Sequence, residues 1–353
     1  MNKSFLSKKY ILPLFASLFI SALFLKNSEL TIGYVRQGLE RCFLTIIPSL
    51  FPFMVVAEIL CECGAPSFLG ALFGKKSRIF GVSQKSLAAI LAGLILGFPI
   101  GTRALIGLYD KNEISKDELT HAVGFCGIPS FGFIVNVMGI SIFSNKLFGI
   151  STYLCAILSA LISGLVFSPR EKVNYKFVTP AMQNKKSSAE IITGAISSAT
   201  GATITLCAYV VFFSCVVGCI SSSGIPRLAG AFAGAFLELS AGASACADVG
   251  GLSGAALCGF TVGWSGLSVH FQAMALLSDR VKSYKKYFFQ KLFQGALCAI
   301  FALFFALLTD FSPSSVTAPA VSLFLSPEYT VVCIILFFVC LVGSKKSLFP
   351  FRK

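Results

Sequence analysis

Long apolar stretches separated by short polar loops run through the whole chain. Few charged residues fall inside these stretches, and most of the charge lies in the loops between them. Segments of this length and polarity are typical of helices buried in a lipid bilayer. We therefore predict an all-α polytopic membrane protein. The ten stretches comprise residues 10–25, 42–60, 87–108, 123–143, 147–167, 191–220, 228–247, 252–277, 292–308 and 329–342.

The amino-acid composition supports the membrane prediction and disfavours several other classes of protein. Of the 353 residues, 56% are apolar and only 12% are charged, whereas soluble domains average about 25% charged residues. The mean hydropathy is +0.83. A soluble enzyme, a nucleic-acid-binding protein and a disulfide-built secreted module are therefore disfavoured. The 13 Cys residues lie mostly in apolar stretches and are predicted to be small buried hydrophobic side chains.

The distribution of basic residues predicts how the stretches cross the membrane. The chain has 29 Lys and Arg against 15 Asp and Glu, a net charge of +14, and cytoplasmic loops collect basic residues. Most of these residues fall on one face if 87–108 and 228–247 fold back instead of crossing. If 87–108 crossed, the basic loop 168–190 would move to the outer face. We predict eight spans, an uncleaved first helix at 10–25, two re-entrant segments and cytoplasmic termini.

An internal repeat relates the two re-entrant segments and divides the chain into halves. Residues 92–96 with Gly101 are echoed by 233–237 with Gly242, and Gly124, Phe125 and Ser130 are echoed by Gly259, Phe260 and Ser265. With the predicted topology the two segments enter from opposite faces, which makes the repeat an inverted one. The predicted divisions are an N-terminal anchor helix and amphipathic segment (1–41), a first membrane half (42–167), a cytoplasmic basic loop (168–190), a second membrane half (191–309), and an extracytoplasmic loop with a C-terminal transmembrane helix (310–353).

Three Gly-containing sequences predict interruptions of helices within the membrane: residues 97–101 around Pro99, 128–132 around Pro129, and 263–266. Unpaired backbone groups persist at this depth only where they line a wet cavity or are buried in protein. The pattern is typical of the substrate site of a secondary transporter. The alternative is that Gly93, Gly97 and Gly101 form only a helix-packing stripe.

Polar residues near these interruptions are the candidate ligand contacts. Glu238 lies in an apolar stretch, where a carboxylate is costly unless it faces a cavity or finds a partner. It is predicted to contact a ligand or couple to protons, or else to bond a neighbouring helix end. Arg103 is predicted either to neutralise an anion or to be a cytoplasmic flanking charge. The other candidates here are Ser268, His270 and Gln272, whereas Glu58 and His121 are interpreted as interfacial.

Several motifs carry no function. The sequence 70–77 resembles a phosphate-binding loop but has one residue too few between its glycines. Cys61 and Cys63 lack a nearby His, so we predict no metal and no cofactor, and no nucleophile and base pair indicates an enzyme. Residues 114–118 are interpreted as a short solvated surface helix with a cap at Ser115.

The motifs in order resemble a known family. They are residues 97–103, 113–115, Phe125 with Cys126, 236–242 and 266–272, and together they are similar to the sporulation integral membrane protein group of the nucleoside-recognition (Gate) domain family. The similarity runs from about residue 48 to about 308. The family usually has Tyr at the position of Phe98, Ala-Lys at Thr102-Arg103, and an Asn-containing turn at Gly127-Ile128.

The resemblance implies a function in sporulation. Members are held to export dipicolinic acid toward the spore from the mother cell, at the outer forespore membrane. The family is related to concentrative nucleoside transporters, which have inverted repeats and re-entrant hairpins. We therefore expect a transporter of a small anionic aromatic solute. The alternatives are a cation-coupled nucleoside transporter and a non-transporting scaffold for a sporulation complex. The coupling ion (a proton or Na⁺), a homo-oligomer and sporulation partners stay open.

Dipicolinate is a flat aromatic dianion, and its binding would require particular contacts. The half-helix N-termini at Gly101 and Gly242 would present N–H groups to two carboxylates, Arg103 would add a charge-assisted bond, and Phe98 and Trp264 would stack on the ring. The full set of predicted substrate-binding residues is Gly97, Phe98, Pro99, Gly101, Thr102, Arg103, Ser130, Glu238, Ser240, Gly242, Trp264, Ser265, Ser268, His270 and Gln272.

Overall fold

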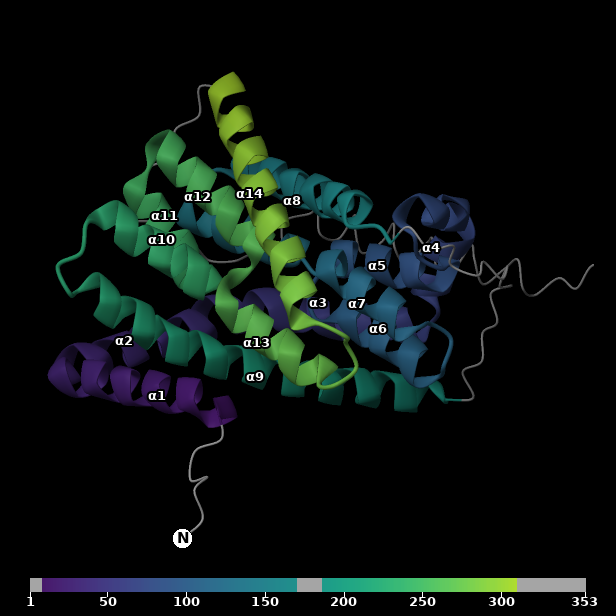
Figure 1. Ribbon diagram of the computed structural model, residues 1–353, viewed down its shortest axis with the longest axis horizontal. Helices are drawn as coiled ribbons and strands as arrows, with labels where there is room; N and C mark the ends of the chain where they lie inside the picture. Colours follow the sequence, from purple (N-terminus) through teal and green to yellow (C-terminus); the bar gives the residue numbers. More distant parts are fainter. Residues whose placement is uncertain (1–7, 170–185, 310–353) are drawn as a thin grey trace, which may run out of the picture.

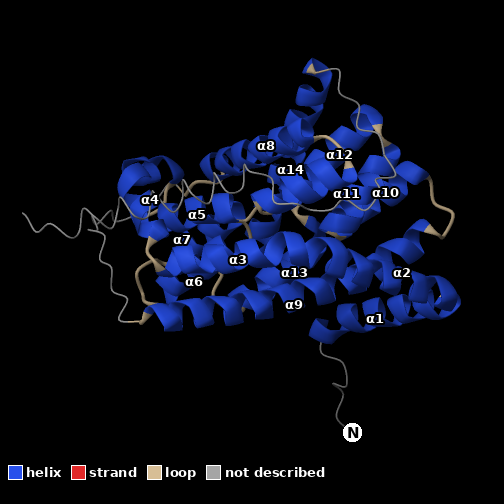
Figure 2. Ribbon diagram, turned by 180° about the vertical axis from the view of Figure 1, so that it is seen from behind, coloured by secondary structure: helices blue, strands red, loops and turns tan. Residues whose placement is uncertain are grey.

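The protein is built from helices throughout the described residues, 8–169 and 186–309 of a computed structural model, which include no strand. Figures 1 and 2 show them from opposite sides. The α-helices are α1 (Lys8–Lys26), α2 (Ser28–Arg41), α3 (Ile47–Glu62), α4 (Ala65–Phe73), α5 (Gln84–Leu96), α6 (Ile100–Asp110), α7 (Lys116–Cys126), α8 (Lys146–Val166), α9 (Ser188–Ser221), α10 (Arg227–Leu237), α11 (Leu239–Val249), α12 (Gly251–Trp264), α13 (Gly266–Leu277) and α14 (Tyr284–Leu308). The segments η1 (Cys42–Ile46) and η3 (Gly132–Ile142) are π-helical, and η2 (Gly74–Phe80) is a 3₁₀-helix.

Five helical runs among the described residues are long and apolar enough to cross a bilayer. They are Ser28–Glu62, Lys146–Val166, Ser188–Ser221, Gly251–Leu277 and Tyr284–Leu308. The protein is therefore an all-α polytopic membrane protein. The predicted C-terminal helix at 329–342, and most of the basic loop 168–190, lie outside the described residues.

Both predicted re-entrant segments are helical hairpins. In the first hairpin α5 packs against α6, and in the second α10 packs against α11. The first arms have 13 and 11 residues, which at 1.5 Å per residue is well short of the ~30 Å hydrocarbon core. Neither arm can cross the membrane alone.

Glycine at equivalent positions lets the arms of each hairpin approach closely. A Cβ on Gly101 would lie 2.7 Å from the Gly93 Cα, and one on Gly242 would lie 2.7 Å from the Ala235 Cα. Gly242 and Gly234 also face each other across the second hairpin. The sequence repeat thus corresponds to two hairpins of the same local construction.

The two hairpins lie toward opposite ends of the molecule's long axis in both views (Figures 1 and 2). Helix α7 lies beside the first hairpin and α12 beside the second, while α3, α13 and α14 lie between the two groups. The 34-residue α9 runs along most of one long side. Helices α3, α9 and α13 each contact elements of both halves of the chain.

Three predictions need correction. The helix after Ser115 does have the expected cap, because Ser115 Oγ accepts a hydrogen bond from Glu118 N. It is not a short surface helix, however, because α7 continues to Cys126 and both Ile114 and Glu118 are buried. His121 is fully buried on the same helix and is not interfacial.

The third correction concerns the last described helix. The apolar stretch from residue 292 predicts a start after the basic loop, but α14 begins at Tyr284. Lys291, which precedes the predicted apolar stretch, is therefore within the helix and is 2% exposed.

Candidate functional site

Four interruptions of helical structure meet at the centre of the molecule. They are residues 97–99 between α5 and α6, residues 127–130 between α7 and η3, Glu238 between α10 and α11, and Ser265 between α12 and α13. The sequence analysis predicted three of these as interruptions. Ser130 and Ser265, which correspond in the repeat, lie in corresponding interruptions.

The interruptions contact each other in pairs. Phe98 N donates a hydrogen bond to Ile128 O at 2.9 Å, which joins the first interruption to the second. Gly97 has φ +90°, and a Cβ there would lie 2.6 Å from the Ser130 Cα, so this approach requires glycine. In the second half Gly266, with φ +79°, packs against the backbone of Glu238 and Leu239. Each hairpin tip therefore rests on a broken helix of its own half.

A small cavity of about 60 Å³ lies where all four interruptions meet. Phe98, Ser130, Glu238 and Ser265 each contribute a wall from a different interruption, and Ser240 and Ser268 add hydroxyl groups. The backbone irregularities thus surround a common space, as expected when they are tolerated at membrane depth.

A main cavity of about 370 Å³ adjoins the small one and shares Leu50, Phe98, Ser130 and Leu206 with it. Helices α3, α9 and α13 and the first hairpin form its walls. Most of its surface is apolar or aromatic, and its polar side chains are Arg103, Ser130, Thr205, Tyr209 and Gln272. This volume and lining are typical of a small-molecule site.

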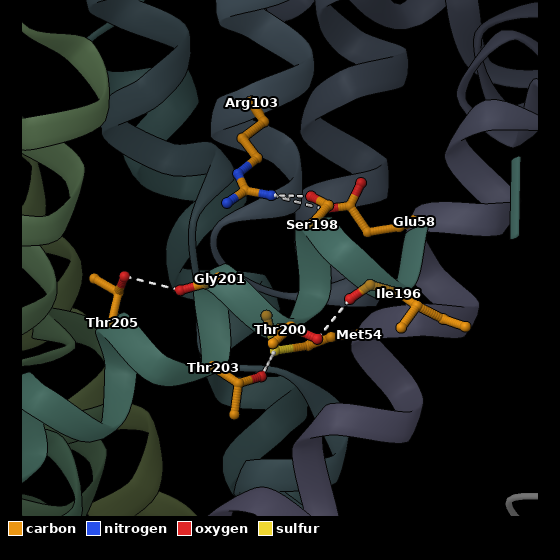
Figure 3. A network of polar contacts seen from close by, with 9 residues as sticks. All are labelled: Met54, Glu58, Arg103, Ile196, Ser198, Thr200, Gly201, Thr203 and Thr205. Atoms are coloured by element: carbon orange, nitrogen blue, oxygen red, sulfur yellow. Dashed lines mark hydrogen bonds and ion pairs between the residues drawn. The ribbon is translucent and has the colours of Figure 1, made fainter. Parts of the chain in front are cut away.

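Arg103 connects the first hairpin to two surrounding helices at the wall of the main cavity (Figure 3). Its Nη1 donates to Glu58 Oε1 of α3 at 2.8 Å and to Ser198 Oγ of α9 at 2.6 Å. Ser198 Oγ donates in turn to the same Glu58 oxygen at 2.9 Å. A guanidinium has five N–H donors, so one terminal nitrogen holds the ion pair while the side chain still lines the cavity.

Glu238 forms its hydrogen bonds with the start of its own helix. The side chain is 2% exposed, and its oxygens accept from Ser240 N at 3.0 Å, Ser240 Oγ at 2.6 Å and Ala241 N at 2.6 Å. This carboxylate caps α11 and offsets the positive end of the helix dipole. The α11 N-terminus is therefore occupied by the protein's own anion, which corrects the expectation that it is open to a ligand carboxylate.

The α6 N-terminus differs from that of α11, because Pro99 provides no side-chain cap. Pro99 and Arg103 line the main cavity. Gln272 lines it as well, and its Nε2 is a buried donor with no hydrogen-bond partner among the described residues. Buried donors are rarely left unpaired, so this amide has the capacity to donate to a group in the cavity.

Nine of the fifteen predicted site residues line the two cavities, and six do not. The cavity residues are Phe98, Pro99, Arg103, Ser130, Glu238, Ser240, Ser265, Ser268 and Gln272. The other six are Gly97, Gly101, Thr102, Gly242, Trp264 and His270. Gly97, Gly101 and Gly242 are instead close-packing positions, and Thr102 lies against the Cys126 sulfur.

Trp264 and His270 form an aromatic cluster outside the cavities. Trp264 Nε1 donates to Phe236 O at 2.8 Å, and its ring stacks on Phe236 with centroids 5.0 Å apart. His270 is fully buried beside Trp264 and contacts Tyr287 Oη through Nδ1 at 2.9 Å. The Trp264 ring, which was expected to stack on a ligand, therefore packs against Phe236 and His270 instead.

A polar face on α14 was missed from the sequence. Tyr287, Gln290, Lys291 and Gln294 are all buried, and their spacing of three and four residues places them on one side of the helix. That spacing was the available signal, but the neighbouring basic residues made the segment resemble a loop. Among the described residues no group of three or more His, Cys, Asp or Glu could hold a metal ion.

The fold and site define an all-α polytopic membrane protein with interrupted helices around two adjoining cavities. The chain is similar to the sporulation integral membrane protein YlbJ of Bacillus subtilis (strain 168), with 24% identity over 348 aligned residues, 86% of this chain and 84% of the relative. Neither a protein-family profile nor a solved structure matches the chain. The similarity supports a sporulation-associated integral membrane protein.

Proposed function

We propose that the protein is a secondary transporter that moves a small anionic aromatic solute, with dipicolinate as the candidate, across the outer forespore membrane of the mother cell. The observation that carries this proposal is the convergence of four helix interruptions on one pair of cavities. Helices interrupted at the midplane between two repeats are the usual construction of secondary-transporter sites. Sliding of one hairpin-bearing half against the other would expose the cavity to each side in turn.

The polar groups of the main cavity favour an anion with hydrogen-bond acceptors. Arg103, the unpaired Gln272 Nε2 and the α6 N-terminus without a side-chain cap lie on its walls or next to them. A positive helix end and a guanidinium both stabilise carboxylates. Glu238 is offset by its own helix and so repels an anion less than a free carboxylate would.

The apolar walls favour a flat ring. Phe53, Phe98 and Tyr209 line the main cavity and offer surfaces on which an aromatic solute can stack. Dipicolinate is a pyridine ring with two carboxylates, and it matches both the aromatic surface and the donors. We also propose that the chain is related to the Gate family and its nucleoside transporters.

The test is exchange of labelled dipicolinate by the full chain reconstituted in vesicles. Gly201 lines the main cavity on α9, and a Cβ there would meet nothing within 4 Å. Gly201→Phe should fill the space and lower the exchange rate at least about tenfold, since a bulky ring competes directly with the solute. Gly194→Phe is the matched control, because Gly194 is also unobstructed on α9 but does not line the cavity.

Each alternative has its own outcome in this assay. Exchange of uridine in place of dipicolinate would show a nucleoside carrier. Absence of exchange for both solutes by the intact chain would favour a scaffold. Equal exchange by the two Phe variants would mean that the solute does not pass through the main cavity.

A further inference from the structure

Lys291 is a buried cation that the proposed function does not yet use. It lies on the membrane-crossing helix α14 and is 2% exposed. Its Nζ donates to Gly127 O and, at 3.1 Å, to Gln294 Oε1. Ionisable side chains within the membrane are expensive and usually functional, so the position of this one requires a reason.

Lys291 contacts the second interruption next to the point where the first hairpin is hydrogen-bonded to it. Gly127 ends α7 and begins the second interruption, and the next carbonyl, Ile128 O, accepts the hydrogen bond from Phe98 N of the first hairpin. Carbonyls at the C-terminal end of a half-helix carry partial negative charge. The Lys291 ammonium therefore neutralises the unwound segment on which the first hairpin rests.

No carboxylate pairs with Lys291 among the described residues. Its described surroundings carry no carboxylate: they are the amides of Gln290 and Gln294 on α14, the Cys126 thiol on α7 and the His270 imidazole on α13, with Tyr287 one turn earlier on α14. Amide nitrogens of Gln290 and Gln294 have no partner here. The ammonium is held by a backbone carbonyl oxygen and an amide oxygen, which are two kinds of oxygen that also bind metal cations.

We propose that the Lys291 ammonium occupies the place of a coupling metal cation, so that this transporter is independent of sodium. Unwound backbone carbonyls and side-chain oxygens are the ligands with which transporters coordinate Na⁺. That the replaced cation is a coupling ion depends on the proposed transport function. The cation position itself rests only on the contacts of Lys291.

Removal of the side chain should convert a tethered cation site into a sodium site. The experiment is thermal unfolding of the purified full chain in detergent, in matched sodium chloride and choline chloride. Lys291→Ala should unfold at a lower temperature than wild type in choline. It should regain about 2 °C or more in sodium, the size expected for a ligand well above its Kd. Lys285→Ala is the matched control, because Lys285 is an exposed lysine on the same helix. The control and the wild type should show no difference between the salts.

Two outcomes would overturn the inference: Lys291→Ala stabilised equally by both salts, or a wild-type protein that sodium itself stabilises. If the alanine variant does not fold, Lys291→Arg replaces it. The arginine variant should behave as wild type in both salts, and a sodium response would contradict the proposal. In vesicles, sodium-dependent dipicolinate exchange by wild type would also contradict it. Absence of any exchange would instead contradict the proposed function and leave the unfolding result standing.

Discussion

Glu113 and Glu118, five residues apart, have different energetic roles although both carry hydrogen bonds. Glu118 is 5% exposed, and its Oε1 accepts from Ser83 N and Ser86 Oγ, both at 2.6 Å, which joins α7 to the start of α5. Glu118→Ala would leave these donors unpaired, so we expect a loss of about 1–3 kcal/mol and a lower unfolding temperature. The Glu113 side chain pairs with Lys85 at 2.6 Å, and both side chains are about one third exposed, so Glu113→Ala should cost less than about 1 kcal/mol. Equal losses in thermal unfolding would contradict this assignment.

At the scale of helices, tight packing within the first hairpin makes a further prediction. A Cβ on Gly101 would come within 2.7 Å of the Gly93 Cα, whereas one on Gly107, in the same helix, would meet nothing within 4 Å. Gly101→Ala should therefore separate the arms and destabilise the protein by about 1–3 kcal/mol. Gly107→Ala should be neutral or stabilise it by up to about 1 kcal/mol. Unfolding of both variants in detergent decides between this contact and a loosely packed hairpin.

The sequence predicted individual helices and interruptions better than the contacts between them. Pro and Gly around Pro99 and Pro129 act locally, so the breaks could be found from a single chain. The convergence of the interruptions depends on long-range packing that one sequence does not reveal. Lys291 was misassigned because loop charges and buried charges look alike until its helix is known to begin at Tyr284. Trp264 was expected at the ligand because its partner, Phe236, is distant in sequence.

At the scale of the whole molecule, we predict that the two hairpins enter the membrane from opposite faces. Two salt bridges connect the end of α6 and the start of α7 to the loop before α14: Arg280 to Asp110 at 2.8 Å, and Lys282 to Asp117 at 2.6 Å. These segments therefore share one end of the molecule, and their basic residues predict that this end faces the cytoplasm. At the base of the second hairpin, Arg227 contacts Asp248 O, and this end is predicted to lie outside.

Single cysteines on the two hairpins test this arrangement. With the exposed Cys63 replaced by Ser, Asn112→Cys after α6 and Ser223→Cys before α10 place exposed thiols beside opposite hairpins. A membrane-impermeant maleimide added to intact cells that carry the chain in their plasma membrane should label the cysteine at 223 and reach the one at 112 only after permeabilisation. The variant with Cys63 replaced and no added cysteine measures the background from the remaining native thiols, of which Cys61, Cys155 and Cys207 are partly buried. Labelling of both positions from the same side would mean parallel hairpins, and an inverted repeat could not then alternate access to the cavity.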